Sequence, residues 1–79
     1  MDLGYGVKAY RLFRDLTQEE LAKGAGLDQG YVSKVENRRR TRMSPDKVVR
    51  LARALGVTVE ELLDPPADVR AAMDERAAA

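Results

Sequence analysis

The amino-acid sequence predicts an all-α fold, a compact bundle of five short helices to which a further C-terminal helix can be added. Three observations carry this prediction. Apolar residues recur at helical spacing in several short segments, side chains suited to helix capping stand just before these segments, and glycines stand just after two of them. A chain of 79 residues is long enough for one small domain with a modest core.

The composition argues against several classes of function. Cysteine is absent, so neither a disulfide nor a thiolate metal site can form, and histidine, the commonest metal ligand, is absent too. We therefore expect no catalysis, no cofactor and no bound metal. No apolar run approaches the roughly 20 residues that a membrane span requires, and the start lacks the apolar core of a secretory signal. These features lead us to expect a soluble, cytoplasmic protein with no membrane partner.

A first helix is expected from about Val7 to Arg14. The residues before it should be frayed, because two glycines make a poor helix start. Val7, Tyr10 and Arg11 share one face of this helix at spacings of three and four residues. An arginine on a largely apolar face needs a partner, since a buried guanidinium without one is costly.

The stretch at 16–42, LTQEELAKGAGLDQGYVSKVENRRRTR, predicts two short helices, a tight turn and a basic loop. Thr17 and Glu20 fit a capping box at the start of a helix over residues 18–25. Gly26 can end that helix, and Asp28 can cap the next one, over residues 29–37. Two helices joined by so short a glycine-containing turn match the helix-turn-helix pattern, whose second helix enters the DNA major groove.

Two further helices follow the basic loop. Ser44 and Pro45 suit the cap and first turn of a fourth helix that Gly56 ends. Thr58 suits the start of a short fifth helix. The side chains expected to face inward from these two helices are Val48, Leu51, Ala52, Leu55, Leu62 and Leu63.

The prolines at 65 and 66 divide the chain into a helix-turn-helix domain over residues 1–64 and a C-terminal tail or helix over residues 65–79. Val69 and Met73 are the recognisable apolar pair of the second segment. We favour a partly ordered helix, which could serve as a dimerisation element or as a linker to a missing C-terminal domain. A loose tail is the remaining alternative.

Several segments resemble the Cro and phage-repressor (Xre-like) helix-turn-helix family. They are LTQEELA at 16–22, AGL at 25–27, YVSKVEN at 31–37 and VVRLARALGVTVEELL at 48–63. The resemblance covers about residues 7–63 and implies a lambda-repressor-like fold. In that family an arginine of the first helix pairs with a glutamate near the end of the recognition helix, which implies a structural ion pair between Arg11 and Glu36. In many relatives the last helix also joins two monomers.

The exposed face of the helix at 29–37 supplies the expected base contacts, which are Gln29, Tyr31, Ser33 and Lys34. A glutamine amide can pair with adenine N6 and N7, and a lysine can donate to guanine or to a phosphate. Tyr31 can donate its hydroxyl to a phosphate or set its ring against a thymine methyl group. The expected phosphate contacts, some of them implied by the resemblance, are Gln18, Asn37, Arg38, Arg39, Arg40 and Arg42.

Two positions depart from the family pattern. Gly30 stands where relatives often carry a glutamine or a serine, which thins the direct reading of bases and leaves room for Tyr31. Arg38 stands where relatives commonly have a glycine. Either Asn37 or Arg38 must then adopt the left-handed conformation, or the loop must differ.

Charge is distributed unevenly along the chain. Residues 1–57 hold 12 Lys or Arg against 7 Asp or Glu, a net charge of +5, whereas residues 58–79 hold 2 against 6, a net charge of −4. A basic patch beside an exposed helix is expected of a protein that binds a polyanion. We therefore expect a sequence-specific double-stranded DNA-binding transcriptional regulator, a repressor, that acts as a homodimer on a two-fold symmetric operator. An antitoxin that binds a toxin and represses its own operon is the alternative, since the acidic C-terminal part suits a basic partner.

Overall fold

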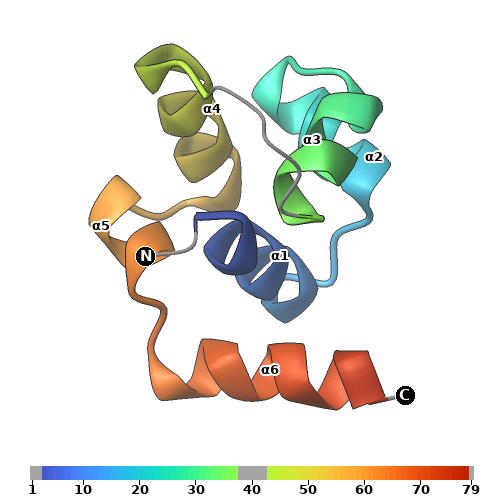
Figure 1. The fold of residues 1–79 in the computed structure, drawn as a ribbon, viewed down its shortest axis with the longest axis vertical. Helices are drawn as coiled ribbons and strands as arrows, with labels where there is room; N and C mark the ends of the chain where they lie inside the picture. Colours follow the sequence, from blue (N-terminus) through green and yellow to red (C-terminus); the bar gives the residue numbers. More distant parts are fainter. Residues whose placement is uncertain (1–2, 38–42, 79) are drawn as a thin grey trace.

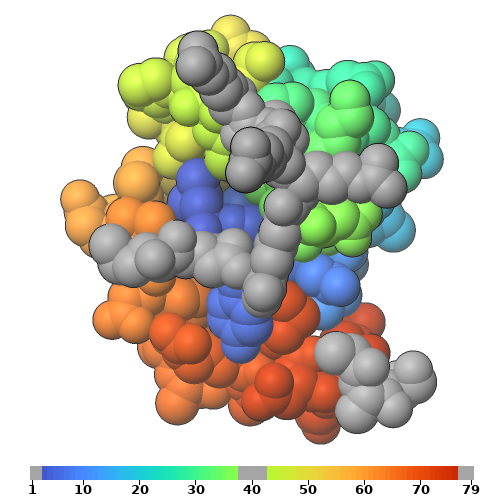
Figure 2. Space-filling model, viewed as in Figure 1, coloured from blue at the N-terminus to red at the C-terminus, as the bar shows by residue number. Residues whose placement is uncertain are grey.

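The computed structural model describes residues 3–37 and 43–78 and confirms the all-helical architecture (Figure 1). Six helices follow one another in this part of the chain: α1 (Leu3–Phe13), α2 (Gln18–Ala25), α3 (Gln29–Glu36), α4 (Pro45–Leu55), α5 (Val59–Leu63) and α6 (Ala67–Ala78). Helix α1 lies in the middle of the bundle, where it packs against α3, α4, α5 and α6. Figure 2 shows α5 and α6 covering one side of the molecule and α3 and α4 the opposite side.

The ends of the helices follow the local signals in the sequence. The side chains that accept a backbone N–H at a helix start belong to Thr17, Asp28, Ser44 and Thr58. Gly26 and Gly56 end α2 and α4 with φ angles of 67° and 72°. This left-handed conformation is one that a glycine adopts without a steric cost, so each helix stops where the sequence predicts.

One hydrophobic core joins all six helices. Its largest fully buried side chains are Leu21, Leu51, Leu55, Leu62, Val7, Val32 and Val69. Two residues expected to face inward are only half-buried, Val48 and Leu63. Helix α5 has only five residues, and Leu62 is the one that it buries completely. Its neighbour Leu63 therefore lies at the edge of the core.

The prediction of a frayed start before residue 7 is wrong. Helix α1 begins at Leu3, and both of its early glycines are buried. A Cβ atom added to Gly6 would overlap the backbone carbonyl of Leu62 in α5. The glycine that weakens the helix by propensity therefore allows α5 to approach closely, and this tertiary packing outweighs the propensity.

The C-terminal segment forms an ordered helix that packs against α1. Val69 and Met73 are 2% and 9% exposed and belong to the common core. Near the start of α6, the Arg70 guanidinium lies 5.7 Å from the ring centroid of Tyr5, while near its end Arg76 pairs with Asp15, just beyond α1. These two contacts make α6 run in the same direction as α1 (Figure 1).

Candidate nucleic-acid interface

The turn between α2 and α3 sets which face of α3 is exposed. Asp28 caps α3 by accepting a hydrogen bond from the backbone N–H of Gly30, with 3.1 Å between Oδ2 and N. Val32 and Val35 then point into the core and are 0% and 5% exposed. The opposite face of the helix consequently carries polar side chains at the surface. This is the arrangement that a helix needs if its side chains are to reach base edges in a groove.

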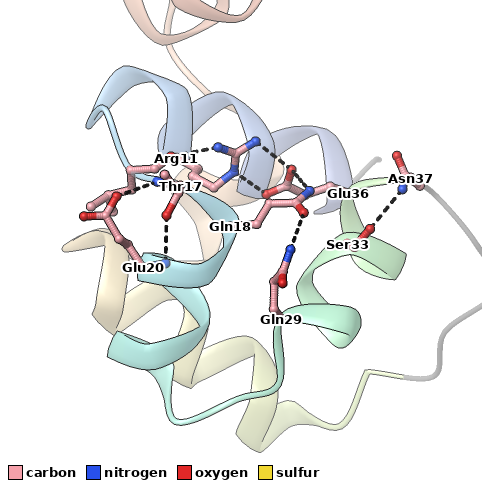
Figure 3. Close-up of polar contacts among 9 residues, drawn as sticks. Arg11, Thr17, Gln18, Glu20, Gln29, Ser33, Glu36 and Asn37 are labelled. Atoms are coloured by element: carbon pink, nitrogen blue, oxygen red, sulfur yellow. Dashed lines mark hydrogen bonds and ion pairs between the residues drawn. The ribbon is translucent and has the colours of Figure 1, made fainter.

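A buried ion pair fixes α3 against α1 (Figure 3). Glu36 receives two hydrogen bonds from the Arg11 guanidinium, of 2.7 Å from Nε to Oε2 and 3.0 Å from Nη2 to Oε1. Arg11 also donates from Nη1 to the carbonyl oxygen of Leu16 at 2.7 Å. The guanidinium therefore ties together the end of α3 and the segment that leads into α2. The structure thus brings together the two residues expected to form the structural ion pair.

Two glutamine side chains extend this ion pair toward the surface of α3 (Figure 3). Gln18 donates from Nε2 to Glu36 Oε1 at 3.1 Å, which turns its own Oε1 toward Gln29. The Nε2 atom of Gln29 lies 3.5 Å from that oxygen. Within the described part of the chain, the carbonyl oxygen and one N–H of the Gln29 amide have no partner, and adenine offers the matching donor and acceptor.

The end of α3 carries another polar pair. Asn37 donates from Nδ2 to Ser33 Oγ at 3.2 Å, which leaves the Ser33 hydroxyl proton free to be donated elsewhere. Lys34 is exposed on the same helix. Asn37 has φ −84° and ψ 8°, so it does not take the left-handed conformation that was one of the expected alternatives. The arginines predicted to contact phosphates, Arg38, Arg39, Arg40 and Arg42, lie outside the described residues.

Tyr31 lies differently from its exposed neighbours on α3. It is half-buried, and its hydroxyl is covered and has no hydrogen-bond partner among the described residues. Burial raises the pKa of this hydroxyl above its usual value of 10.0. Donation of the hydroxyl to a phosphate would require the side chain to move. The other predicted role, a ring contact with a thymine methyl group, stays a prediction.

Lys47 of α4 is a neighbour of this surface that the sequence reasoning missed. Its Nζ atom lies 4.5 Å from the centroid of the Tyr31 ring. The two residues are 16 positions apart and belong to different helices, so no helical spacing pairs them. A lysine in the first turn of a helix, against the positive end of the helix dipole, is the one signal that the sequence offered.

Other kinds of site find little support in the described parts of the chain. Residues 3–37 and 43–78 contain no group of three or more acidic, histidine or cysteine side chains arranged to hold a metal ion. Every helix within the same ranges is too short or too polar to cross a membrane.

Known proteins share both the sequence pattern and the fold. Residues 7–62 match the family model for the helix-turn-helix. A hypothetical transcription factor of Neisseria meningitidis serogroup B is 42% identical over 64 residues, which are 81% of this chain and 59% of that protein. The chain thus spans about three fifths of this relative.

Solved structures of bacterial regulators superpose closely on this chain. The restriction-modification controller protein C.AhdI of Aeromonas hydrophila is 36% identical and has a TM-score of 0.72, with 77% of this chain and 91% of that chain covered. The N-terminal DNA-binding domain of SinR from Bacillus subtilis is 31% identical and has a TM-score of 0.73, with 82% and 94% covered. SinR has also been crystallised in complex with DNA. From its sequence and its fold, this chain belongs to the Cro- and Xre-like helix-turn-helix family.

Proposed function

We propose that this chain is a sequence-specific double-stranded DNA-binding repressor of transcription that inserts α3 into the major groove of its operator. The observation that carries the proposal is the exposed polar face of α3, anchored from behind by the Arg11–Glu36 ion pair and by the amide of Gln18. A reading helix has to be held rigidly, because a small displacement breaks several base contacts at once. Similarity to SinR, which binds DNA, supports the same proposal.

The proposed contacts divide into two classes. Gln29, Ser33 and Lys34 read base edges, because each has donors or acceptors that no other described residue pairs with. The Tyr31 ring lies beside a thymine methyl group. Phosphate contacts, which set the register without reading sequence, come from Gln18, Asn37 and the arginines at 38–40 and 42.

Repression by this chain requires a homodimer, since one short helix reads only a few base pairs. Two copies related by a two-fold axis would hold their α3 helices about 34 Å apart, one turn of DNA, and would read a two-fold symmetric operator. Occupancy of that operator excludes other proteins from the site. Because lysines and arginines displace counterions from the phosphates, binding weakens steeply as salt is raised.

The proposal is tested by selecting fragmented genomic DNA with the purified protein near physiological salt. Wild-type protein is expected to enrich a two-fold symmetric motif, and Gln29→Ala and Lys34→Ala are expected to lose or alter it. Glu75→Ala, at an exposed position of α6, is the matched control and should enrich the same motif as wild type. Failure of a well-folded wild-type sample to enrich any sequence would overturn the proposal and favour a protein partner.

A charge reversal gives a sharper second test. Lys34→Glu should abolish operator binding, since it sets a carboxylate against bases and phosphates, and the exposed position should leave the thermal melt unchanged. Lys23→Glu alters the net charge equally, but on α2, and should keep the sequence preference. Wild-type affinity in the Lys34→Glu variant would rule out α3 as the reader.

A further inference from the structure

Lys47 adds a positive charge beside α3, and it belongs to a second helix, α4. It is half-buried in the first turn of α4, and its Nζ atom lies 4.5 Å from the centroid of the Tyr31 ring. A cation at this distance from an aromatic face is attracted by the ring quadrupole. The contact holds the long lysine side chain against Tyr31 of α3.

The Tyr31 side chain makes its contacts through its ring and not through its hydroxyl. The hydroxyl is buried without a hydrogen-bond partner in the described ranges, an arrangement that costs free energy. The ring, in contrast, packs against the hydrophobic core, and its centroid lies 4.5 Å from the Lys47 ammonium. The electrostatic contact that the structure shows for this side chain is therefore the one between its ring and the Lys47 ammonium.

The charge of Lys47 is not neutralised where it stands. Among residues 3–37 and 43–78, no carboxylate forms an ion pair with it, and the acidic neighbour in the same turn, Asp46, pairs with Arg50 at 3.1 Å. A cation in the first turn of a helix also faces the positive end of the helix dipole. The helix dipole thus disfavours a lysine at this position, whereas an anion approaching from outside would be favoured by both the lysine and the helix start.

We propose that Lys47 binds a DNA phosphate beside the groove that α3 enters, and that Tyr31 is the positioning residue that holds it there. This rests on the proposed function of the chain as a DNA-binding regulator. The ring restricts the lysine side chain before DNA arrives, so less conformational freedom is lost on binding. Because a phosphate contact carries no sequence information, Lys47 strengthens binding to every sequence equally.

The test measures the affinity of the full chain for two labelled duplexes over a series of KCl concentrations. One duplex carries the sequence that wild-type protein enriches, and the other is a scrambled duplex of the same length. Lys47→Met, which keeps most of the stem and removes the charge, should weaken binding to both duplexes by the same factor. It should also reduce the slope of log affinity against log salt by about 0.9.

Three further variants separate positioning from charge. Tyr31→Phe keeps the ring and should lose less affinity for both duplexes than Tyr31→Leu does. Tyr31→Leu removes the ring and should weaken binding to both duplexes. When Lys47→Met is added to Tyr31→Leu, the further loss of affinity should be smaller than the loss that Lys47→Met causes in the wild-type protein. Arg53→Met removes a charge from the exposed last turn of the same helix and should leave the slope unchanged.

The outcomes distinguish this proposal from the one on which it rests. If folded wild-type protein bound neither duplex, both the role of Lys47 and the proposed function would be overturned. Binding by wild type with an unchanged affinity and salt slope in Lys47→Met would overturn the role of Lys47 alone. An equal loss of slope in Arg53→Met would also overturn it, since the effect would then reflect net charge and not a phosphate contact.

Discussion

The guanidinium of Arg11 in α1 and the carboxylate of Glu36 in α3 form a two-point ion pair whose side chains are 11% and 1% exposed. The second carboxylate oxygen also accepts a hydrogen bond from Gln18. Charges so far from water are tolerated only when their hydrogen bonds are made within the protein. The pair therefore sets the position of α3 relative to α1, and with it the position of the reading face.

Removing one partner of this ion pair should strongly lower the stability of the fold. Arg11→Met is expected to lower the free energy of unfolding by about 3–5 kcal/mol, because it leaves a buried carboxylate without its cation. Urea denaturation followed by circular dichroism measures the change. The double variant Arg11→Met with Glu36→Leu removes both charges and should be more stable than Arg11→Met alone. A loss below about 1 kcal/mol in the single variant would show that the pair does not hold α3 in place against α1.

Gly6 in α1 and Gly24 in α2 should respond to substitution by alanine in opposite directions. Gly6→Ala is expected to destabilise the protein by about 1–3 kcal/mol, since its methyl group would overlap the carbonyl of Leu62 and push α5 away from α1. At Gly24 the new methyl group would meet only the Cβ atom of Ala54, at 3.7 Å. Gly24→Ala should therefore stabilise by about 0.5–1 kcal/mol through helix propensity. Equal effects of the two substitutions in urea would contradict the close approach at Gly6.

Much of the fold follows from local signals, and the exceptions are contacts between distant segments. Capping residues such as Thr17 act on amides two or three positions away, so their effect can be read from the sequence alone. The first turns of α1 pack through Gly6 against the backbone of Leu62, which is more than fifty residues further along. The left-handed residue beyond α1 is Asp15, with φ 58°, where the sequence offers no glycine as a signal. It pairs with Arg76, a contact that only the folded chain creates.

Some contacts of the candidate site could likewise be predicted from the sequence, whereas others could not. Arg11 and Glu36 could be paired in advance because the family resemblance links them, and the structure brings them together. Lys47 could not be found from spacing, since its partner is a ring on another helix. The buried hydroxyl of Tyr31 was equally hidden, because helical periodicity sets Tyr31 on the exposed face. The assignments of Gln29 and its neighbours to bases stay predictions.

Glu20 should make the stability of the chain depend on pH in the acid range. Its pKa is lowered from the usual 4.5, first by the backbone N–H of Thr17, which donates to its carboxylate, and then by the Thr17 side chain. A lowered folded-state pKa means stability that is present above pH 4.5 and lost as the pH falls through the folded value. Glu20→Gln should therefore be less stable than wild type at neutral pH, and the difference should shrink in acid.

The control for Glu20 is Glu19→Gln, which removes the same charge from the same helical turn but leaves the capping box intact. Urea unfolding of both variants and wild type, at neutral pH and below pH 4.5, separates the capping bond from the general effect of a charge near the helix start. A pH-independent difference between Glu20→Gln and wild type would mean that the carboxylate does not titrate through this bond.

Helix α6 should unfold together with the rest of the domain, although its sequence offers few apolar residues. Met73 is 9% exposed in the core, so Met73→Ala should lower the free energy of unfolding by about 2 kcal/mol. Thermal melts followed by circular dichroism should show one transition at a lower temperature. Glu75→Ala, an exposed change two residues further on, should stay within about 0.5 kcal/mol of wild type. A melting temperature unchanged by Met73→Ala would instead mean that α6 is a loosely attached tail that contributes nothing to the stability of α1.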